Sequence, residues 1–430
     1  MKTSFWSFAL SLICVSSISS EALAAESAKF EIKVAAGPQV RTGVPVRVDV
    51  AVPVALKDAT QASIQLKSGK TIVAQATAPS LLSKPLQVGA GEVHRQLCFI
   101  VDKLDADQTI EGVAIVTADA SKSSDQFRWQ DHDGKFVDLE VGDRPVLRYM
   151  YEALDESTPD RRGETYKVYH HVFDPSGKLL VTKGPGGKFP HHRGLYFGFN
   201  KITYDGKKKA DVWHCSGKSF QSHDGFTASE VGPVLGRHSV KVGWHGQDGE
   251  VFAEENREMT VYRQPEADGK PVGTLIEFAS ILRTTGGDIQ LNGDPQHSGF
   301  HFRAPNEVAE KTAGQTYYIR PEGVGKPGDY RNWPDKKDQV NFPWKGMSFV
   351  FGDQRYTAAN LDRPENPKES RFSERDYGRF GSYFEYKLTK DNPLKLDYRI
   401  WLQPGEMTVA QIDAMAKDFT NPPIVTANKQ

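Results

Sequence analysis

Two short segments of the chain combine histidine, which can transfer protons near neutral pH or ligate a metal ion, with arginine, which can bind an anionic group. The first contains His191, His192 and Arg193 and follows a glycine-rich stretch. Neighbouring side chains of a strand point to opposite faces, so His191 and His192 would share a pocket only where the backbone is irregular. Pro190, directly before them, permits such an irregularity.

The second segment contains His297, His301 and Arg303, with Phe300 and Phe302 between them. If this segment is a strand, alternation places the two histidines and the arginine on one face. Both phenylalanines then point into the core. Histidines four residues apart in a strand are about 13 Å apart, too far to ligate one metal ion directly. We therefore expect them at opposite ends of an extended ligand, unless a bend brings them together.

Two further segments add polar and aromatic side chains. Residues 211–215, interpreted as a strand, contain Trp213 and His214, and an aromatic side chain beside a polar cluster is a common platform for a sugar ring. Residues 369–379 contain three carboxylates and three arginines. Such a segment either forms a salt-bridged loop or orients a substrate, because arginine pairs bidentately with carboxylates. Lys345 lies in a segment that we expect to line the same face.

Compact metal-binding and nucleophile motifs are absent from the sequence. It contains no His-Glu-x-x-His zinc motif, no Gly-x-Ser-x-Gly elbow and no phosphate-binding Walker loop. The histidines themselves are the remaining sequence feature that could indicate a metal site. No cofactor is predicted, and a bound divalent metal ion stays open.

Charge and targeting signals restrict the classes of partner. Lys and Arg total 54 and Asp and Glu total 55, a net charge of −1, which argues against a nucleic-acid partner because phosphate binding needs a basic surface. Residues 1–24 are typical of a secretory signal peptide, and no later apolar run is long enough to span a bilayer. We therefore expect a periplasmic or extracellular protein. The oligomeric state and the pairing of Cys98 with Cys215 stay open.

The hydrophobic pattern predicts an all-β protein with two domains. Residues 26–130 show short alternating strands and predict a small β-sandwich that serves as an accessory domain. Residues 134–425 contain about fifteen strands with hardly a helix between them, which predicts a large antiparallel sandwich. One C-terminal helix is expected, because Thr408 and Gln411 fit a capping box and Asn421 precedes two prolines.

At these segments the chain resembles the bacterial PmoA-like family, also labelled methane oxygenase PmoA. The resemblance rests on the strings YHHVFDPSGKLLVTKGPGGKFPHHRGLYFGFN, DPQHSGFHFR, WKGMSFV and NPKESRFSERDYGRFGSYFEY, which are spread over residues 145–405. It implies a large domain that looks like the β-supersandwich of galactose mutarotase-like proteins. Mutarotases and related lyases of this shape use a histidine and a carboxylate to move protons on a sugar.

That analogy implies roles for the polar residues. The acid–base candidates are His191, His192 and His301, with Glu369, Glu374 or Asp376 as the carboxylate partner. The substrate-binding candidates are Arg193, Trp213, His214, His297, Arg303, Lys345, Arg371 and Arg375.

Three functions follow from these residues, each with a carbohydrate or another small polar substrate as partner. The favoured one is a secreted carbohydrate-active hydrolase, lyase or epimerase, in which the histidines converge in a pocket with a carboxylate in hydrogen-bond reach. The second is a carbohydrate-binding protein without turnover, with an aromatic platform formed by Trp213, Tyr196 or Trp344. The third is a metal-dependent enzyme, whose ligand candidates are His191, His192, His214 and His301.

Overall fold

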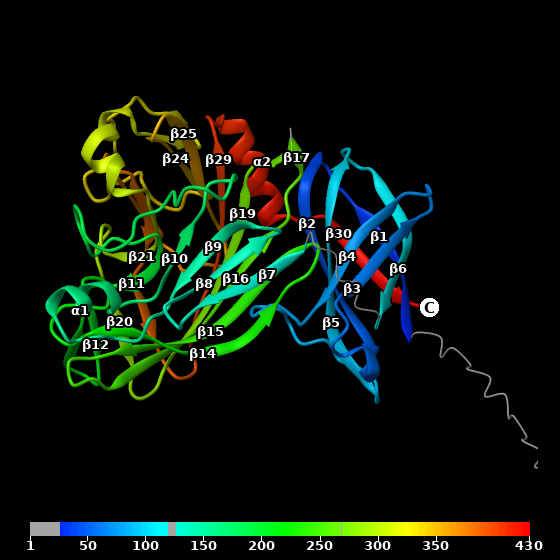
Figure 1. Cartoon of the computed structure of the whole chain (residues 1–430), viewed down its shortest axis with the longest axis horizontal. Helices are drawn as coiled ribbons and strands as arrows, with labels where there is room; N and C mark the ends of the chain where they lie inside the picture. Colours follow the sequence, from blue (N-terminus) through cyan, green and yellow to red (C-terminus); the bar gives the residue numbers. More distant parts are fainter. Residues whose placement is uncertain (1–25, 119–125, 268) are drawn as a thin grey trace, which may run out of the picture.

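The computed structural model describes residues 26–118, 126–267 and 269–430, which form two β-rich domains packed side by side (Figure 1). The expected signal peptide, residues 1–24, lies outside the described residues. So does part of the segment in which the domain boundary is expected, residues 119–125.

The smaller domain is a seven-stranded antiparallel sheet that curls around its own core. Its order is β2-β5-β4-β3-β6-β1-β30, and the two outermost strands, β2 and β30, come into contact. In β1, Phe30, Ile32 and Val34 are buried while the alternating lysines and glutamate are exposed. The strands are β1 (Ser27–Ala35), β2 (Arg41–Pro53), β3 (Gln61–Leu66), β4 (Thr71–Thr77), β5 (Glu92–Leu104), β6 (Thr109–Thr117) and β30 (Ile424–Lys429).

The larger domain is built on an eight-stranded and a nine-stranded antiparallel sheet. The eight-stranded sheet consists of, in spatial order, β26 (Arg371–Arg375), β27 (Arg379–Tyr383), β21 (Ser298–Arg303), β11 (Leu195–Phe199), β10 (Tyr169–Val172), β9 (Arg144–Met150), β8 (Phe136–Val141) and β7 (Phe127–His132). The nine-stranded sheet consists of β14 (Phe220–Glu230), β15 (Leu235–His245), β16 (Val251–Tyr262), β19 (Thr274–Thr284), β29 (Leu394–Pro404), β25 (Gln354–Asp362), β24 (Trp344–Phe351), β22 (Tyr317–Arg320) and β23 (Gly323–Val324).

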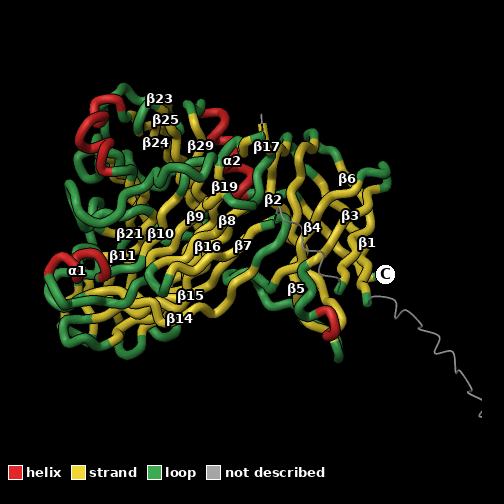
Figure 2. Tube along the Cα trace, viewed as in Figure 1, coloured by secondary structure: helices red, strands yellow, loops and turns green. Residues whose placement is uncertain are grey.

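These two sheets face each other across one aromatic core. Phe300 of β21 stacks on Phe278 of β19 with ring centroids 4.2 Å apart, and Phe197 of β11 packs on the same phenylalanine. Figure 2 shows how strands dominate this domain, with loops gathered at its edges. The smaller strands are β12 (Ile202–Tyr204), β13 (Lys208–Ala210), β20 (Ile289–Leu291) and β28 (Tyr386–Leu388), which form a four-stranded sheet, and the pair β17 (Glu266–Ala267) and β18 (Lys270–Pro271).

Helices are few and short. The C-terminal helix α2 (Val409–Thr420) begins with the predicted capping box between Thr408 and Gln411, and its buried Ile412 and Phe419 pack against the larger domain. A second, unpredicted helix, α1 (Pro159–Thr165), precedes β10. The remaining turns of helix are η1 (Val54–Leu56), η2 (Val308–Thr312) and η3 (Ala313–Gln315). None of the helices in the described part of the chain is long and apolar enough to cross a membrane.

The structure confirms the all-β fold class and differs from the expected element limits at both ends of the larger domain. Residues 127–130 were expected in the smaller domain, but they belong to β7, which pairs with β8 in the larger domain. The last strand, β30, crosses back and pairs with β1 in the smaller domain. Cys98 and Cys215 are both buried and free.

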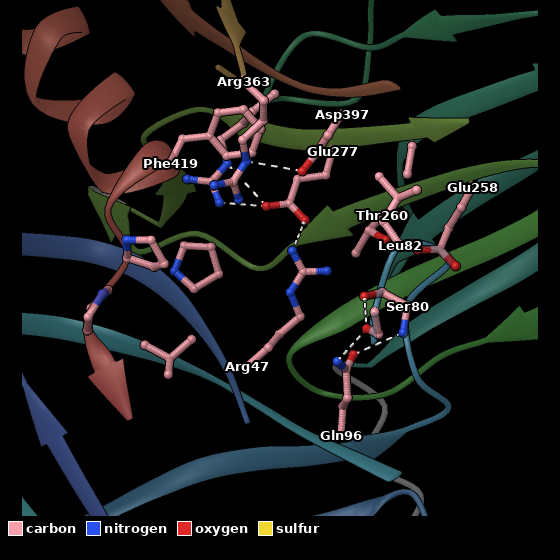
Figure 3. Close-up of a pocket in the computed structure, with 17 residues that line it drawn as sticks. Arg47, Ser80, Leu82, Gln96, Glu258, Thr260, Glu277, Arg363, Asp397 and Phe419 are labelled. Carbon is pink, nitrogen blue, oxygen red and sulfur yellow. Dashed lines mark hydrogen bonds and ion pairs between the residues drawn. The ribbon is translucent and has the colours of Figure 1, made fainter. Parts of the chain in front are cut away.

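The two domains meet at a polar pocket of about 280 Å³ (Figure 3). In it, Arg47 from the smaller domain and Arg399 both donate to Glu277, at 2.7 and 2.5 Å. Arg363 pairs with Asp397 at 3.1 Å. Each of these three arginines therefore has a carboxylate partner.

Candidate functional site

The candidate site lies on the outer face of the eight-stranded sheet, at β11, β21 and β27. Alternation along these strands sends Phe197, Phe300 and Phe302 into the core, as expected for β21. His301 and Arg303 therefore point the other way. Three loops cover this outer face: residues 183–194, 211–219 and 292–297.

His191 and His192 share the site because the chain turns at them instead of continuing as a strand. The backbone N–H of His192 donates to the carbonyl of Phe189, which closes the turn, and β11 begins only at Leu195. The two imidazole centroids are 4.4 Å apart. The irregular backbone considered for this segment is therefore present, and both histidines face one point.

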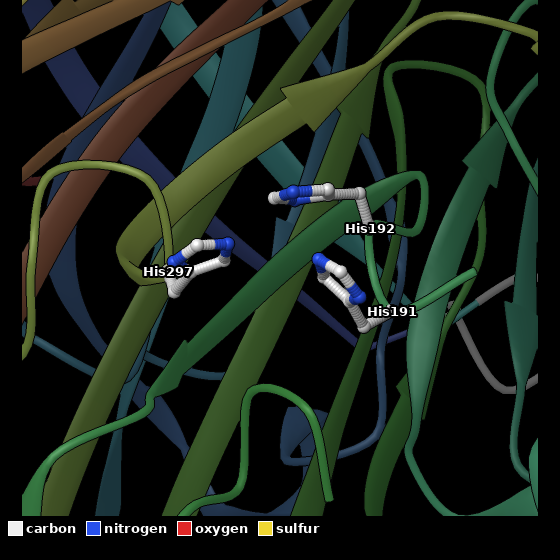
Figure 4. A group of neighbouring side chains, drawn as sticks. All are labelled: His191, His192 and His297. Atoms are coloured by element: carbon white, nitrogen blue, oxygen red, sulfur yellow. The ribbon is translucent and has the colours of Figure 1, made fainter. Parts of the chain in front are cut away.

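His297 completes a group of three histidines that we call the histidine triad: His191, His192 and His297 (Figure 4). Their ligand nitrogens all lie within 4.8 Å of one another. His297 precedes β21 and does not belong to it. The distance of about 13 Å between His297 and His301, which assumed one continuous strand, therefore does not apply. His214 lies beside the triad, with its ring centroid 4.5 Å from those of His191 and His297.

Two identical turns present His214 and His297. In each, an aspartate three residues earlier accepts hydrogen bonds from the histidine backbone N–H and from Nδ1 of the same histidine. The Nδ1 distances are 2.8 Å for Asp211 to His214 and 3.0 Å for Asp294 to His297. An ionised carboxylate only accepts, so Nδ1 carries the proton and the lone pair of Nε2 faces away from the aspartate. This arrangement orients a metal-ligating histidine.

The surroundings of His191 and His192 favour their neutral forms. Burial and the neighbouring His214 and Lys167 lower the pKa of His191 to about 2, and burial together with Arg379 lowers the pKa of His192 well below its ordinary value. Nε2 of His191 and Nδ1 of His192 are buried without a hydrogen-bond partner among the described residues. Neutral imidazoles with unsatisfied nitrogens are the form that binds a metal ion.

The triad fits a divalent transition metal. Zinc–nitrogen bonds of about 2.0–2.1 Å need ligand nitrogens roughly 3.3 Å apart, so small ring rotations suffice. Three histidines with an open fourth position are the ligand set of catalytic zinc sites. His214 is placed to fill that position or to border it.

His301 was expected as an acid–base or ligand residue, and the structure places it beside the triad instead of in it. Its Nδ1 accepts from Arg379 at 3.0 Å, and its ring packs against Trp213 at 4.7 Å. Burial and Arg379 lower its pKa well below the ordinary value. Gly381 makes room for this ring, because a Cβ there would lie 2.2 Å from His301 Cδ2.

Lys167, which we did not predict, connects the loops that carry the histidines. Its ammonium donates to the carbonyls of His191, at 3.0 Å, and of Trp213. Burial lowers its pKa to about 7. A lone lysine gives no sequence signal, whereas the repeated Asp-x-x-His spacing at Asp211 and Asp294 would have revealed both turns.

The expected carboxylate partners do not reach the histidines. Glu374 is buried and bridges Arg320 and Lys345, each at 2.6 Å, because alternation on β26 turns it away from the face on which Ser373 bonds Arg379. Glu369 pairs with Arg371 at 3.0 Å. Asp376 accepts from the backbone N–H of Tyr377.

Four of the other expected substrate contacts are also engaged elsewhere. Arg371 stacks on Trp333, with Cζ 4.3 Å from the ring centroid, and also pairs with Glu385 at 2.8 Å. Arg375 donates to the carbonyl of Glu374. Arg193 donates to the carbonyls of Pro190 and of Gly163 in α1, and Lys345 belongs to the Glu374 network.

The aromatic platforms expected for a sugar are buried. Trp213 and Tyr196 lie edge to face under the loops, 5.1 Å apart, and Trp344 packs in the core beneath α2. The exposed aromatic side chain at the site is Phe189, which lies on Tyr377 at 4.6 Å and near His192 at 6.2 Å.

Comparisons with known proteins place the chain in a family. No curated protein matches it. Among solved structures, a protein in the glycosyl hydrolase family 38 from Enterococcus faecalis matches with a TM-score of 0.40 and 7% identity. The match covers 93% of this chain and 47% of that one, so this chain spans about half the length of that protein. Residues 136–417, more than half of the chain, match the family described as "Family of unknown function (DUF6807)". The protein belongs to this DUF6807 family.

Proposed function

We propose that the protein is a secreted, metal-dependent enzyme that acts on a carbohydrate, with the histidine triad as its metal ligands. The observation that carries this proposal is the convergence of three imidazoles within 4.8 Å from loops about a hundred residues apart in sequence. The turn at Asp294 holds the third of them in position.

The geometry favours metal chemistry over direct histidine–carboxylate acid–base catalysis. The carboxylates near the triad, Asp211 and Asp294, bond to Nδ1 of a histidine and so orient it. The carboxylates expected as acid–base partners lie in other networks. A bound divalent cation supplies Lewis-acid polarisation of a sugar oxygen or of a water molecule.

The remaining groups at the site suit a sugar-sized polar ligand. His191, His214 and His297 are partly exposed, so a ligand can reach the triad from solvent. Phe189 presents a partly exposed ring beside them, on which the apolar face of a sugar ring can pack. The burial of Trp213, Tyr196 and Trp344 speaks against a binding protein that relies on an open aromatic platform.

Activity screening with metal replacement tests this function. Purified protein would be treated with EDTA, reloaded with Zn²⁺, Mn²⁺ or no metal, and assayed on a panel of polysaccharides and oligosaccharides. We expect turnover that depends on metal and is lost in His297→Ala. His94→Ala is the matched control, because His94 also bonds an aspartate, Asp49, but lies in the smaller domain. Turnover that survives both EDTA and His297→Ala would refute the proposal.

A further inference from the structure

The buried cations of this protein divide into two groups. Eleven lysines and arginines are buried among the described residues. Six of them have a carboxylate oxygen within 4.0 Å: Arg41, Arg237, Arg257, Arg320, Lys345 and Arg399. The other five have none in the described part of the chain: Lys167, Lys183, Arg193, Arg303 and Arg379.

All five unpaired cations surround the histidine triad. Lys167 and Arg193 donate hydrogen bonds to backbone carbonyls of the loops and so fix the loop conformation. Lys183 is fixed beside Arg303, because its backbone N–H donates to the carbonyl of Arg303 at 2.9 Å. Arg303 and Arg379 are directly opposite each other on β21 and β27.

Arg303 and Arg379 have N–H groups without an acceptor. Nε and Nη2 of Arg303 and Nε of Arg379 are buried without a hydrogen-bond partner among the described residues. Arg303 uses Nη1 on the carbonyls of Ala304 and Tyr377, and Arg379 uses its other nitrogens on His301 and Ser373. Two like charges opposite each other in a sheet, with donors to spare, form an anion-binding arrangement that the folded chain leaves incomplete.

We infer that the substrate carries an anionic group, a carboxylate or a sulfate ester on the sugar, which binds Arg303 and Arg379 beside the triad. This inference rests on the proposed function for the identity of the substrate as a sugar. Imidazole ligands bring no negative charge, so they would leave the charge of a divalent metal ion uncompensated as well, and an anionic ligand would neutralise both sets of charges.

Aromatic side chains mark the path to this subsite. Cζ of Arg303 lies 4.9 Å from the ring centroid of Tyr377, and Tyr377 lies 6.0 Å from His192. Phe189 covers Tyr377 from outside. Gly186, Gly187 and Phe189 all have a positive φ, of 72°, 62° and 56°, a conformation that a non-glycine residue such as Phe189 rarely adopts. Because Arg303 is fully buried, an anionic group can reach it only after covering side chains such as Phe189 and Tyr377 move.

Binding measured by isothermal titration calorimetry tests the inference. The probes are trigalacturonate, a sulfated oligosaccharide of similar length, a neutral trisaccharide and inorganic sulfate. We expect one of the anionic sugars to bind at least 10-fold more tightly than the neutral one, and its affinity to fall as salt is added. Which anionic sugar binds distinguishes the carboxylate from the sulfate ester.

Variants then locate the subsite. Arg303→Gln and Arg379→Gln should each weaken binding of the anionic sugar about 10- to 100-fold, as expected for a lost charge-assisted hydrogen bond. Binding of the neutral sugar should change little. Lys84→Gln removes an exposed charge from the smaller domain and should have no effect. Circular dichroism confirms that each variant is folded.

Two results would overturn the inference. One is neutral sugars binding as tightly as anionic ones, or no anionic probe binding at all. The other is unchanged binding of the anionic sugar in folded Arg303→Gln and Arg379→Gln. The titrations are run with metal-free and with Zn²⁺-loaded protein. If the anionic sugar binds to the metal-free protein but no metal-dependent turnover is found, the proposed metal chemistry fails and the anionic subsite stands.

Discussion

Replacing Arg303 with methionine should make the protein more stable, although arginine is a large, fully buried side chain there. Burial lowers the pKa of Arg303 from 12.5 to about 10, and the nearby Arg379 adds to this effect. At about 1.36 kcal/mol per pKa unit, keeping this guanidinium charged costs the folded state roughly 3 kcal/mol. Methionine fills a similar volume without a charge.

Lost contacts offset part of that gain. The substitution removes the Nη1 hydrogen bonds to the carbonyls of Ala304 and Tyr377 and the contact with the Tyr377 ring, together worth about 2 kcal/mol. We therefore expect Arg303→Met to raise the free energy of unfolding by about 1 kcal/mol, which corresponds to about 2 °C in Tm. The same variant should lose binding of the anionic sugar.

Arg257→Met is the matched control, because Arg257 is equally buried but pairs with Glu255 at 2.8 Å. Removing it leaves a buried carboxylate without its counter-charge, which should cost about 3–5 kcal/mol. Urea unfolding followed by circular dichroism, with EDTA and without anions, measures both variants. A loss of stability in Arg303→Met as large as that in Arg257→Met would refute the view that Arg303 is an uncompensated charge.

Three further outcomes follow from the structure. Asp294→Asn should weaken Zn²⁺ affinity about 10- to 100-fold in a chelator competition titration, whereas Asp288→Asn, at an exposed pair with Lys387, should not. Glu374→Gln should lower the free energy of unfolding by about 3–5 kcal/mol, because it leaves the buried Arg320 and Lys345 without a carboxylate partner. Unchanged stability together with lost activity would instead indicate a catalytic role for Glu374. Burial and the Glu277 charge raise the pKa of Asp397 to about 6, so its stabilising contribution is complete below about pH 3.8 and is lost as the pH rises through 6. This shift is worth about 3 kcal/mol at pH 7.5, and the lost pair with Arg363 offsets about 1 kcal/mol of it. Asp397→Asn should therefore raise the free energy of unfolding by about 2 kcal/mol relative to the parent at pH 7.5 and by a smaller margin at pH 5. An equal margin at both pH values would contradict this account.

The sequence predicted the class of fold well because strand periodicity is a local property. Alternation in β21 correctly placed Phe300 and Phe302 in the core. The capping box at Thr408 located the start of α2. The return of β30 to the smaller domain could not be predicted, since pairing between the two ends of the chain leaves no local pattern.

The site was harder to predict because turns, and not strands, present its histidines. Interpreting residues 211–215 and 297–303 as strands separated His214 and His297 from His191, whereas two Asp-x-x-His turns bring them together. The acidic partner of the histidines was sought at Glu369, Glu374 or Asp376. The actual partners of Glu374 are Arg320 and Lys345, which come from other strands of the larger domain. Arg303 and Arg379 have buried N–H groups without a hydrogen-bond acceptor among the described residues. The sequence could not reveal this feature, because burial and contacts depend on the three-dimensional fold.

The most direct measurement of the central claim is anomalous X-ray scattering at the zinc edge from crystals of the protein equilibrated with Zn²⁺. Metal ligation by the histidine triad predicts one strong peak about 2.0–2.1 Å from a ring nitrogen of each of His191, His192 and His297. That peak should vanish in His297→Ala. Zinc bound elsewhere, with no peak among these three rings, would contradict it.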